Sequence, residues 1–230
     1  MSEFLHFAEH RLQEMALVFM ALVYTIRIWW LFRFTAGKER QPATGLPGTT
    51  PAKGILYSLG IIAMPWTMES TRTKWFLYVQ FVIFHLGVTF AIVLSFVIPY
   101  TPGLLSFTPV VLLFQSIVAG AFLVGVARMY RRIFDPYIRA ISSPDDYFSL
   151  LLLTVWFFFA FLAAPNRTDW GEWQLLTFFL LTAFFLVYVP FSKISHYLYY
   201  PFTRYFFGKS MGYRGVYPIK RGQRPTPAGN

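Results

Sequence analysis

Five long apolar blocks dominate the sequence and determine the class of fold. They run over Met15–Phe34, Trp75–Ile98, Leu104–Ala127, Tyr147–Ala164 and Trp173–His196. A helix needs about 20 apolar residues to cross the hydrocarbon core of a bilayer, and each block is close to that length. We therefore predict an all-α integral membrane protein, a bundle of five transmembrane helices within residues 15–200.

A sixth apolar run, Gly54–Trp66, is 13 residues long and contains Pro65. That length is too short to span a membrane and suits a helix that lies in the interface or re-enters the membrane. We predict an interfacial segment over residues 54–66, between the first and second spans.

The distribution of Lys and Arg predicts the orientation of the bundle. Apart from Arg11 and Arg167, all of these residues lie at one side: in the 37–74 loop, in the loop after the third block, in the tail, or at the adjoining helix ends. Cytoplasmic loops of membrane proteins carry the excess of basic residues. We therefore expect an outer N-terminal segment over residues 1–14 and a basic cytoplasmic tail over residues 201–230. Topology and contact with lipid headgroups account for the net charge of +10, so nucleic acid is not an expected partner.

Composition excludes several classes of function. The chain has no Cys, which rules out disulfides, thiolate metal sites and a cysteine nucleophile in this chain. Only 13% of its residues are charged, about half the usual share of about 25% in soluble domains. No Asp or Glu lies in the middle of the five blocks, which disfavours a proton-coupled transporter.

Two histidines are the ionisable residues that most need an explanation. His85 lies within the second block and His196 at the end of the fifth. An ionisable residue inside a membrane segment indicates a functional site, although each His could instead hydrogen-bond a neighbouring helix. Two His on separate helices suit a bis-imidazole haem centre within an apolar bundle. The second block can tilt, which would bring His85 toward the cytoplasmic side.

Three motifs resemble the gamma-subunit family of respiratory nitrate reductase, which includes the membrane subunits of heterodisulfide-reductase-like and sulfite-reduction-linked complexes. The first is Phe84-His85-Leu86-Gly87 on the second helix. The second is the loop Arg131–Ala140 followed by Ser142, Ser143 and Asp145, and the third is Pro190–Lys193 with His196 and Pro201. The resemblance covers residues 15–205.

The resemblance implies a membrane cytochrome b subunit in the cytoplasmic membrane of a bacterium or archaeon. Such a subunit passes electrons between membrane quinone and a cytoplasmic iron–sulfur protein, and does not act alone on a terminal substrate. Family members with two haems hold each between the second and fifth helices. Here His85 and His196 match one ligand pair, while Ser95 and Phe178 stand at the other, so we expect one haem b on the cytoplasmic side. The alternative is a haem-free structural anchor of a respiratory complex.

Without an outer haem, a quinone site at the outer surface would lie most of a ~30 Å hydrocarbon core from the remaining haem. We therefore expect quinone in the inner half of the bundle, near His85. Basic residues near the inner ends of the helices are candidates for pairing with haem propionates, with simple interfacial anchoring as the alternative. They are Arg27, Arg33, Arg131, Arg132 and Lys193.

Two further features lie outside the membrane blocks. His6 and His10 stand at i and i+4 on the outer side; on one helix face they cannot hold a haem from opposite sides. They are either ordinary interfacial residues or contacts for quinone or an outer partner. The tail from Tyr205, rich in Gly, Pro, Lys and Arg, has the composition of a segment that lies along a partner subunit.

Overall fold

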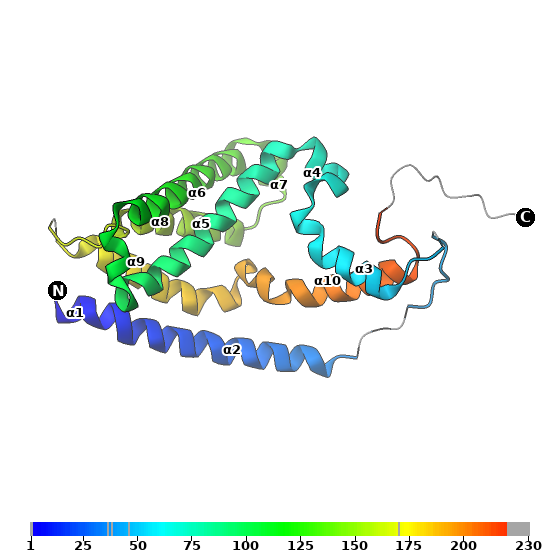
Figure 1. Cartoon of the computed structure of the whole chain (residues 1–230), viewed down its shortest axis with the longest axis horizontal. Helices are drawn as coiled ribbons and strands as arrows, with labels where there is room; N and C mark the ends of the chain where they lie inside the picture. Colours follow the sequence, from blue (N-terminus) through cyan, green and yellow to red (C-terminus); the bar gives the residue numbers. More distant parts are fainter. Residues whose placement is uncertain (1, 36, 38, 46, 170, 220–230) are drawn as a thin grey trace, which may run out of the picture. The chain divides into compact units, whose positions relative to one another are not determined.

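The computed structural model describes residues 2–35, 37, 39–45, 47–169 and 171–219, and every regular element in these ranges is helical (Figure 1). The long helices are α2 (Gln13–Arg33), α5 (Trp75–Tyr100), α6 (Thr108–Phe134), α8 (Pro144–Ala163), α9 (Trp173–Tyr188) and α10 (His196–Tyr213). The short ones are α1 (Glu3–Phe7), α3 (Pro51–Gly60), α4 (Glu69–Thr73) and α7 (Pro136–Ala140). Single turns of 3-10 helix connect several of these elements.

Five helices in the described ranges are long and apolar enough to cross a membrane, as the sequence predicted. They are Glu3–Arg33, Trp75–Tyr100, Thr108–Phe134, Pro144–Ala163 and Trp173–Phe191. The first begins earlier than its apolar block, because α1 continues into α2 through a π-helical segment, Ala8–Leu12. The fifth changes to a 3-10 turn at Val189–Phe191, where Pro190 cannot donate a helical hydrogen bond.

The chain divides into two compact units. The first comprises Val79–Ser195 and the chain before Trp30, and the second comprises Trp30–Tyr78 and the chain from His196 onward. The core of the first unit lies among α5, α6, α8 and α9, and its largest fully buried side chains include Phe157, Phe178 and Phe179. Membrane helices pack closely where small residues meet. An added Cβ on Gly87 of α5 would overlap Ala121 of α6, and one on Gly125 of α6 would overlap Thr154 of α8.

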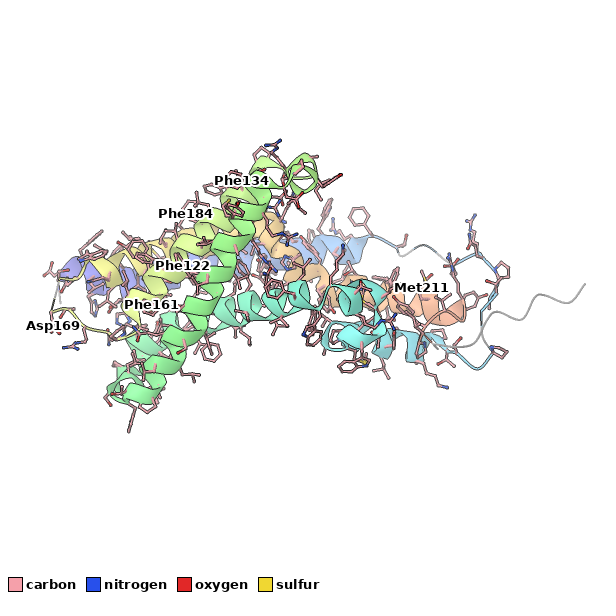
Figure 2. The ribbon with its side chains drawn as sticks, turned by 90° about the horizontal axis from the view of Figure 1, so that it is seen from above. Phe122, Phe134, Phe161, Asp169, Phe184 and Met211 are labelled. Atoms are coloured by element: carbon pink, nitrogen blue, oxygen red, sulfur yellow. The ribbon has the colours of Figure 1, made fainter. Side chains whose placement is uncertain are left out.

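The surface of the first unit is apolar. Phe134 of α6 and Phe184 of α9, labelled in Figure 2, are 64% and 47% exposed. Of the 18 consecutive residues that make the first candidate span most apolar, only 6% are buried. Exposed apolar surface over whole helices is expected where lipid is the solvent.

The second unit contains a tightly packed pair of helices, α3 and α10. The sequence assigned part of this region to an interfacial segment and part to the tail; residues through Tyr213 are helical, while residues 220–230 of the predicted tail lie outside the described ranges. Gly54 and Ser58 of α3 lie against Gly208 and Gly212 of α10. Because these positions carry little or no side chain, the two backbones come into direct contact.

An ion pair at the end of α10 makes the second unit sensitive to acid. Arg214 Nη2 lies 2.9 Å from Glu39 Oε1, and the Ser210 hydroxyl donates to the other carboxylate oxygen. The bond from Arg214, then that from Ser210, lowers the pKa of Glu39 from 4.5 to about 2. A carboxylate with a lowered folded-state pKa stabilises the fold above its unfolded pKa, and this contribution is lost as the pH falls toward the folded-state value.

We therefore expect the end of α10 to open more readily as the pH falls from about 4.5 toward 2. Hydrogen exchange at Ser210–Arg214, corrected for the intrinsic rate, measures this opening. The Glu39→Gln variant should open more than the native chain at neutral pH and should lack the acid transition. A transition that persists in Glu39→Gln would show that another group causes it.

Candidate haem-binding site

His85 lies in the membrane-spanning part of α5 and is half-buried. Its Nδ1 is 2.7 Å from the carbonyl oxygen of Phe81, one turn earlier. A carbonyl can only accept, so Nδ1 carries the proton and Nε2 is the nitrogen with the metal-binding lone pair. Histidines that ligate metals usually donate their other ring N–H to such an acceptor, which fixes the ring and its tautomer. This bond sets the tautomer of His85, with the proton on Nδ1, and restrains the ring.

Two aromatic side chains, Phe81 and Phe84, lie beside this imidazole. The ring centre of Phe81 is 4.1 Å from that of His85, and the buried Phe84 packs edge-on against Phe157. The guanidinium of Arg128 lies 5.0 Å from the centre of the Phe84 ring. Arg128 therefore lies against a ring that itself neighbours His85. The sequence did not indicate Arg128 as a propionate candidate. There, this residue is only one of the basic residues that predict the orientation of the bundle.

His196 is the first residue of α10, and its side chain is exposed. It follows a 3-10 turn in which the hydroxyls of Ser192 and Ser195 donate to backbone carbonyls. His85 belongs to the first unit and His196 to the second. The pairing of the two imidazoles on one iron therefore stays a prediction.

Ser95 and Phe178, the residues expected in place of a second ligand pair, both make packing contacts within the first unit. The buried Ser95 donates its hydroxyl to the carbonyl of Ile92, 2.8 Å away. Phe178 is fully buried, and its ring is stacked 6.1 Å from that of Trp156. Trp156 in turn donates to Thr182 at 2.8 Å. The number of haems stays a prediction.

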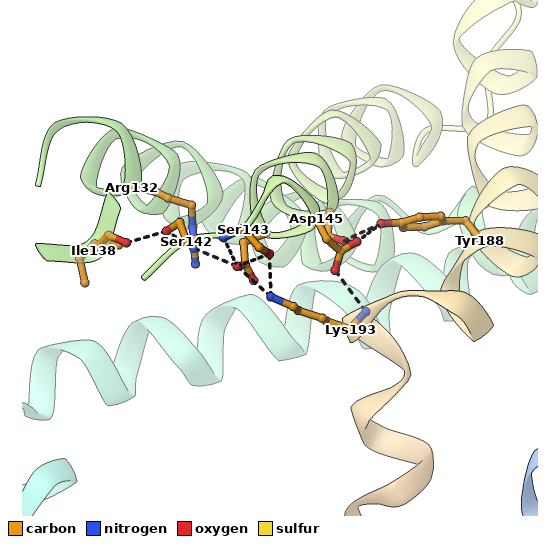
Figure 3. Close-up of polar contacts among 9 residues, drawn as sticks. Arg132, Ile138, Ser142, Ser143, Asp145, Tyr188 and Lys193 are labelled. Atoms are coloured by element: carbon orange, nitrogen blue, oxygen red, sulfur yellow. Dashed lines mark hydrogen bonds and ion pairs between the residues drawn. The ribbon is translucent and has the colours of Figure 1, made fainter. Parts of the chain in front are cut away.

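The sequence-predicted propionate candidates divide into two groups. Lys193 Nζ contacts the Ser143 hydroxyl at 2.7 Å and Asp146 at 3.0 Å. Arg132 Nη1 donates to Ser142 at 2.6 Å, and its Nε is buried without a hydrogen-bond partner. These two cations are therefore engaged in a polar network at the start of α8 (Figure 3).

The other three candidates lie outside that network. Arg27 of α2 lies 5.5 Å from the centre of the Phe191 ring, next to the 3-10 turn that ends the fifth span. Arg33 is in the last turn of α2 and Arg131 is in the last turn of α6. Arg27 and Arg131, like Arg132 and Lys193, belong to the same unit as His85, and Arg33 belongs to the second unit. Pairing of these cations with haem propionates stays a prediction.

The network itself joins α6, α8 and α9, and the sequence did not predict it. Tyr188 donates to Asp145 Oδ1 at 2.5 Å and lies 2.9 Å from the Ser149 hydroxyl. Asp146 forms a capping box with Ser143, the N-cap of α8. Asp145 and Asp146 both lie in the first turn of α8. Tyr188 was missed because its partner Asp145 is 43 positions away in the chain.

His6 and His10 lie on one face of the N-terminal helix, as predicted. Their ring centres are 4.7 Å apart, and His10 also packs edge-on against Tyr100 at 5.6 Å. Tyr100 donates to Glu14 at 3.4 Å. These contacts join the start of the first span to the end of α5. A role of His6 or His10 in contacting quinone or an outer partner is not tested by them.

A cavity of about 280 Å³ lies at the C-terminal end of α8, whereas Asp145 lies at the N-terminal end of this helix. It is lined by Gln115, Leu162, Pro165, Arg167, Asp169 and Gln174. The Arg167 and Asp169 side chains are paired at 2.8 Å, and Gln174 Oε1 is buried without a partner. His85 and its neighbours do not line this cavity, so it is not the quinone position that the sequence predicted.

No three His, Asp or Glu side chains gather as a direct metal site in the part of the chain that the structure describes. A haem does not need such a cluster, because the porphyrin supplies four nitrogens and the protein supplies the axial ligands. The chain matches no protein-family model, and comparisons with curated proteins and with solved structures return no significant match.

Proposed function

We propose that this five-span membrane protein is a cytochrome b subunit. It passes electrons between membrane quinone and a cytoplasmic iron–sulfur protein through one haem b. The observation that carries the proposal is His85: an imidazole within a membrane span, with Nδ1 donating to the Phe81 carbonyl. An ionisable side chain within a membrane span indicates a functional role, and a second ring nitrogen bound to an acceptor is usual for a metal-ligating histidine.

The roles of the residues follow from their positions. His85 and His196 would hold the iron, and the aromatic rings around His85 would keep water away from it. The candidates for pairing with propionates stay Arg27, Arg33, Arg131, Arg132 and Lys193, and Arg128, beside the Phe84 ring, joins them. When bound, haem b supplies one-electron redox chemistry, while the chain sets its ligation and dielectric. Hydrogen bonds from Tyr188 and from the backbone N–H of Lys193 to Asp145 hold the end of the fifth span against the start of α8.

A quinol-driven reduction experiment tests this function. The purified full chain, together with any co-purifying subunits, is oxidised and mixed with a soluble quinol under anaerobic conditions. The proposal predicts that a reduced b-type absorbance band appears with quinol and not with the matching quinone. A haem that dithionite reduces and quinol does not would contradict the role in quinone chemistry.

The proposed orientation gives a separate prediction. We expect the N-terminus outside and the tail in the cytoplasm, because 18 of the 20 Lys and Arg lie in inner loops or at inner helix ends. A reporter fused after Asn230 should be active when it requires the cytoplasm and inactive when it requires export. The reverse result would invert the layout and place the proposed iron–sulfur partner on the wrong side.

A further inference from the structure

The charge of the chain is distributed unevenly between its two units. The segments Trp30–Tyr78 and 196–230 hold twelve Lys and Arg but only two carboxylates, Glu39 and Glu69. The rest of the chain holds eight basic and eight acidic residues. The first unit is therefore formally neutral, and the second carries the entire net charge of +10.

The packing of α3 leaves its outward face apolar. Gly54, Ser58 and Ile61 are buried on one side of the helix, where the first two contact α10. At 100° per residue, Leu56 and Leu59 lie on the opposite side, and they are 73% and 38% exposed. This face is too short to span a bilayer and too apolar to favour contact with water.

The same unit also exposes aromatic and basic side chains. Trp66, which follows α3, is 60% exposed. On α10, Phe206, Lys209 and Tyr213 are exposed at positions i, i+3 and i+7, on a different side from the Gly208–Gly212 contact. Trp, Tyr, Lys and Arg beside an apolar face are typical of helices that lie at the boundary between lipid and water.

Few carboxylates balance these cations. Glu39 is held by Arg214 and Ser210 within the unit. Glu69, in the first turn of α4, is the remaining acidic residue of both segments. A surface with an apolar face, interfacial aromatics and uncompensated cations is complementary to a layer of anionic headgroups above hydrocarbon.

We propose that the α3–α10 helix pair lies in the membrane interface and binds anionic phospholipids. Leu56 and Leu59 enter the acyl-chain boundary, while Lys53, Lys209 and neighbouring cations contact lipid phosphates. The Gly54–Gly208 contact keeps the two helices together as one surface element. The proposal does not depend on haem or quinone binding.

The absence of Cys from the chain allows a direct test of depth. A nitroxide label on Leu56→Cys is compared with two references in the full-length protein, reconstituted in vesicles containing phosphatidylglycerol. Leu123→Cys on α6, 65% exposed, is the lipid reference, and Gln41→Cys, in an exposed loop, is the water reference. We expect the Leu56 label to be accessible to oxygen and protected from a water-soluble nickel reagent, as at Leu123.

Accessibility to nickel, as at Gln41, would overturn the proposal because it would place α3 in water. Protection from both reagents would also overturn it, since a protein partner would then cover the face. Selectivity is tested by binding of labelled phosphatidylglycerol to the double variant Lys53→Gln, Lys209→Gln. Each removed charge should weaken binding about fivefold, with no change for labelled phosphatidylcholine. Equal binding by the variant and the native chain would contradict the anionic preference.

Discussion

Replacing His85 with alanine should abolish haem binding by the purified protein. The haem-to-chain ratio should fall from about one toward zero. The imidazole would be an axial ligand of the iron, and in an apolar membrane span water does not readily take its place. The pyridine haemochromogen assay measures this ratio. The side chain of His85 is only half-buried, so the variant should still be recovered as a folded membrane protein.

His10→Ala is the matched control for that experiment. It also removes an imidazole from a long helix, and the ring it removes packs against His6 and Tyr100. We expect this variant to retain its full haem content. Equal losses in both variants would show that the effect comes from general destabilisation and not from ligation. Full haem content in His85→Ala would remove this residue from the proposed site.

Gly208→Ala should separate the α3–α10 pair. The added Cβ would lie 2.6 Å from the Gly54 carbonyl oxygen and 2.7 Å from the Ile55 Cα, and backbone atoms cannot move aside as side-chain ends can. Forcing extra volume into such a contact costs about 1–3 kcal/mol. Amide hydrogen exchange in α3 and α10 should therefore accelerate between about fivefold and 150-fold, provided that these amides exchange through opening of the pair.

Gly60→Ala provides the control, because Gly60 is on the same helix pair. Its added Cβ would meet only the flexible end of Met64 at 3.5 Å. Alanine also has a higher helix propensity than glycine, so exchange in α3 should be unchanged or slower. An equal acceleration in both variants would contradict the close-packing explanation.

The five spans could be predicted from the sequence because hydrophobic length is a local property. The boundaries were less accurate. The first helix starts at Glu3 because α1 continues through the π-helical segment into α2. Polar residues interrupt the first 12 positions, so hydrophobic length alone did not include them in the span. The break near Pro190 was predictable, since proline lacks the donor that the helix needs.

Contacts between distant parts of the chain could not be predicted in the same way. The α3–α10 pair depends on Gly54 meeting Gly208, and no local pattern relates these two residues. The bond between Tyr188 and Asp145 likewise joins residues of different helices. For the candidate site, the sequence identified His85 as a residue that needed a partner. The bond from its Nδ1 to Phe81 emerged only from the structure.

The most direct test of the central claim is the haem content of the native full-length chain. The protein is purified from membranes, and haem b is measured by pyridine haemochromogen assay against protein mass from amino-acid analysis. One haem per chain is the predicted result, with His85 and His196 as ligands and the Phe178 position filled by aromatic packing. Zero haem would contradict the cytochrome proposal and favour a structural anchor, and two haems would contradict the single-site account.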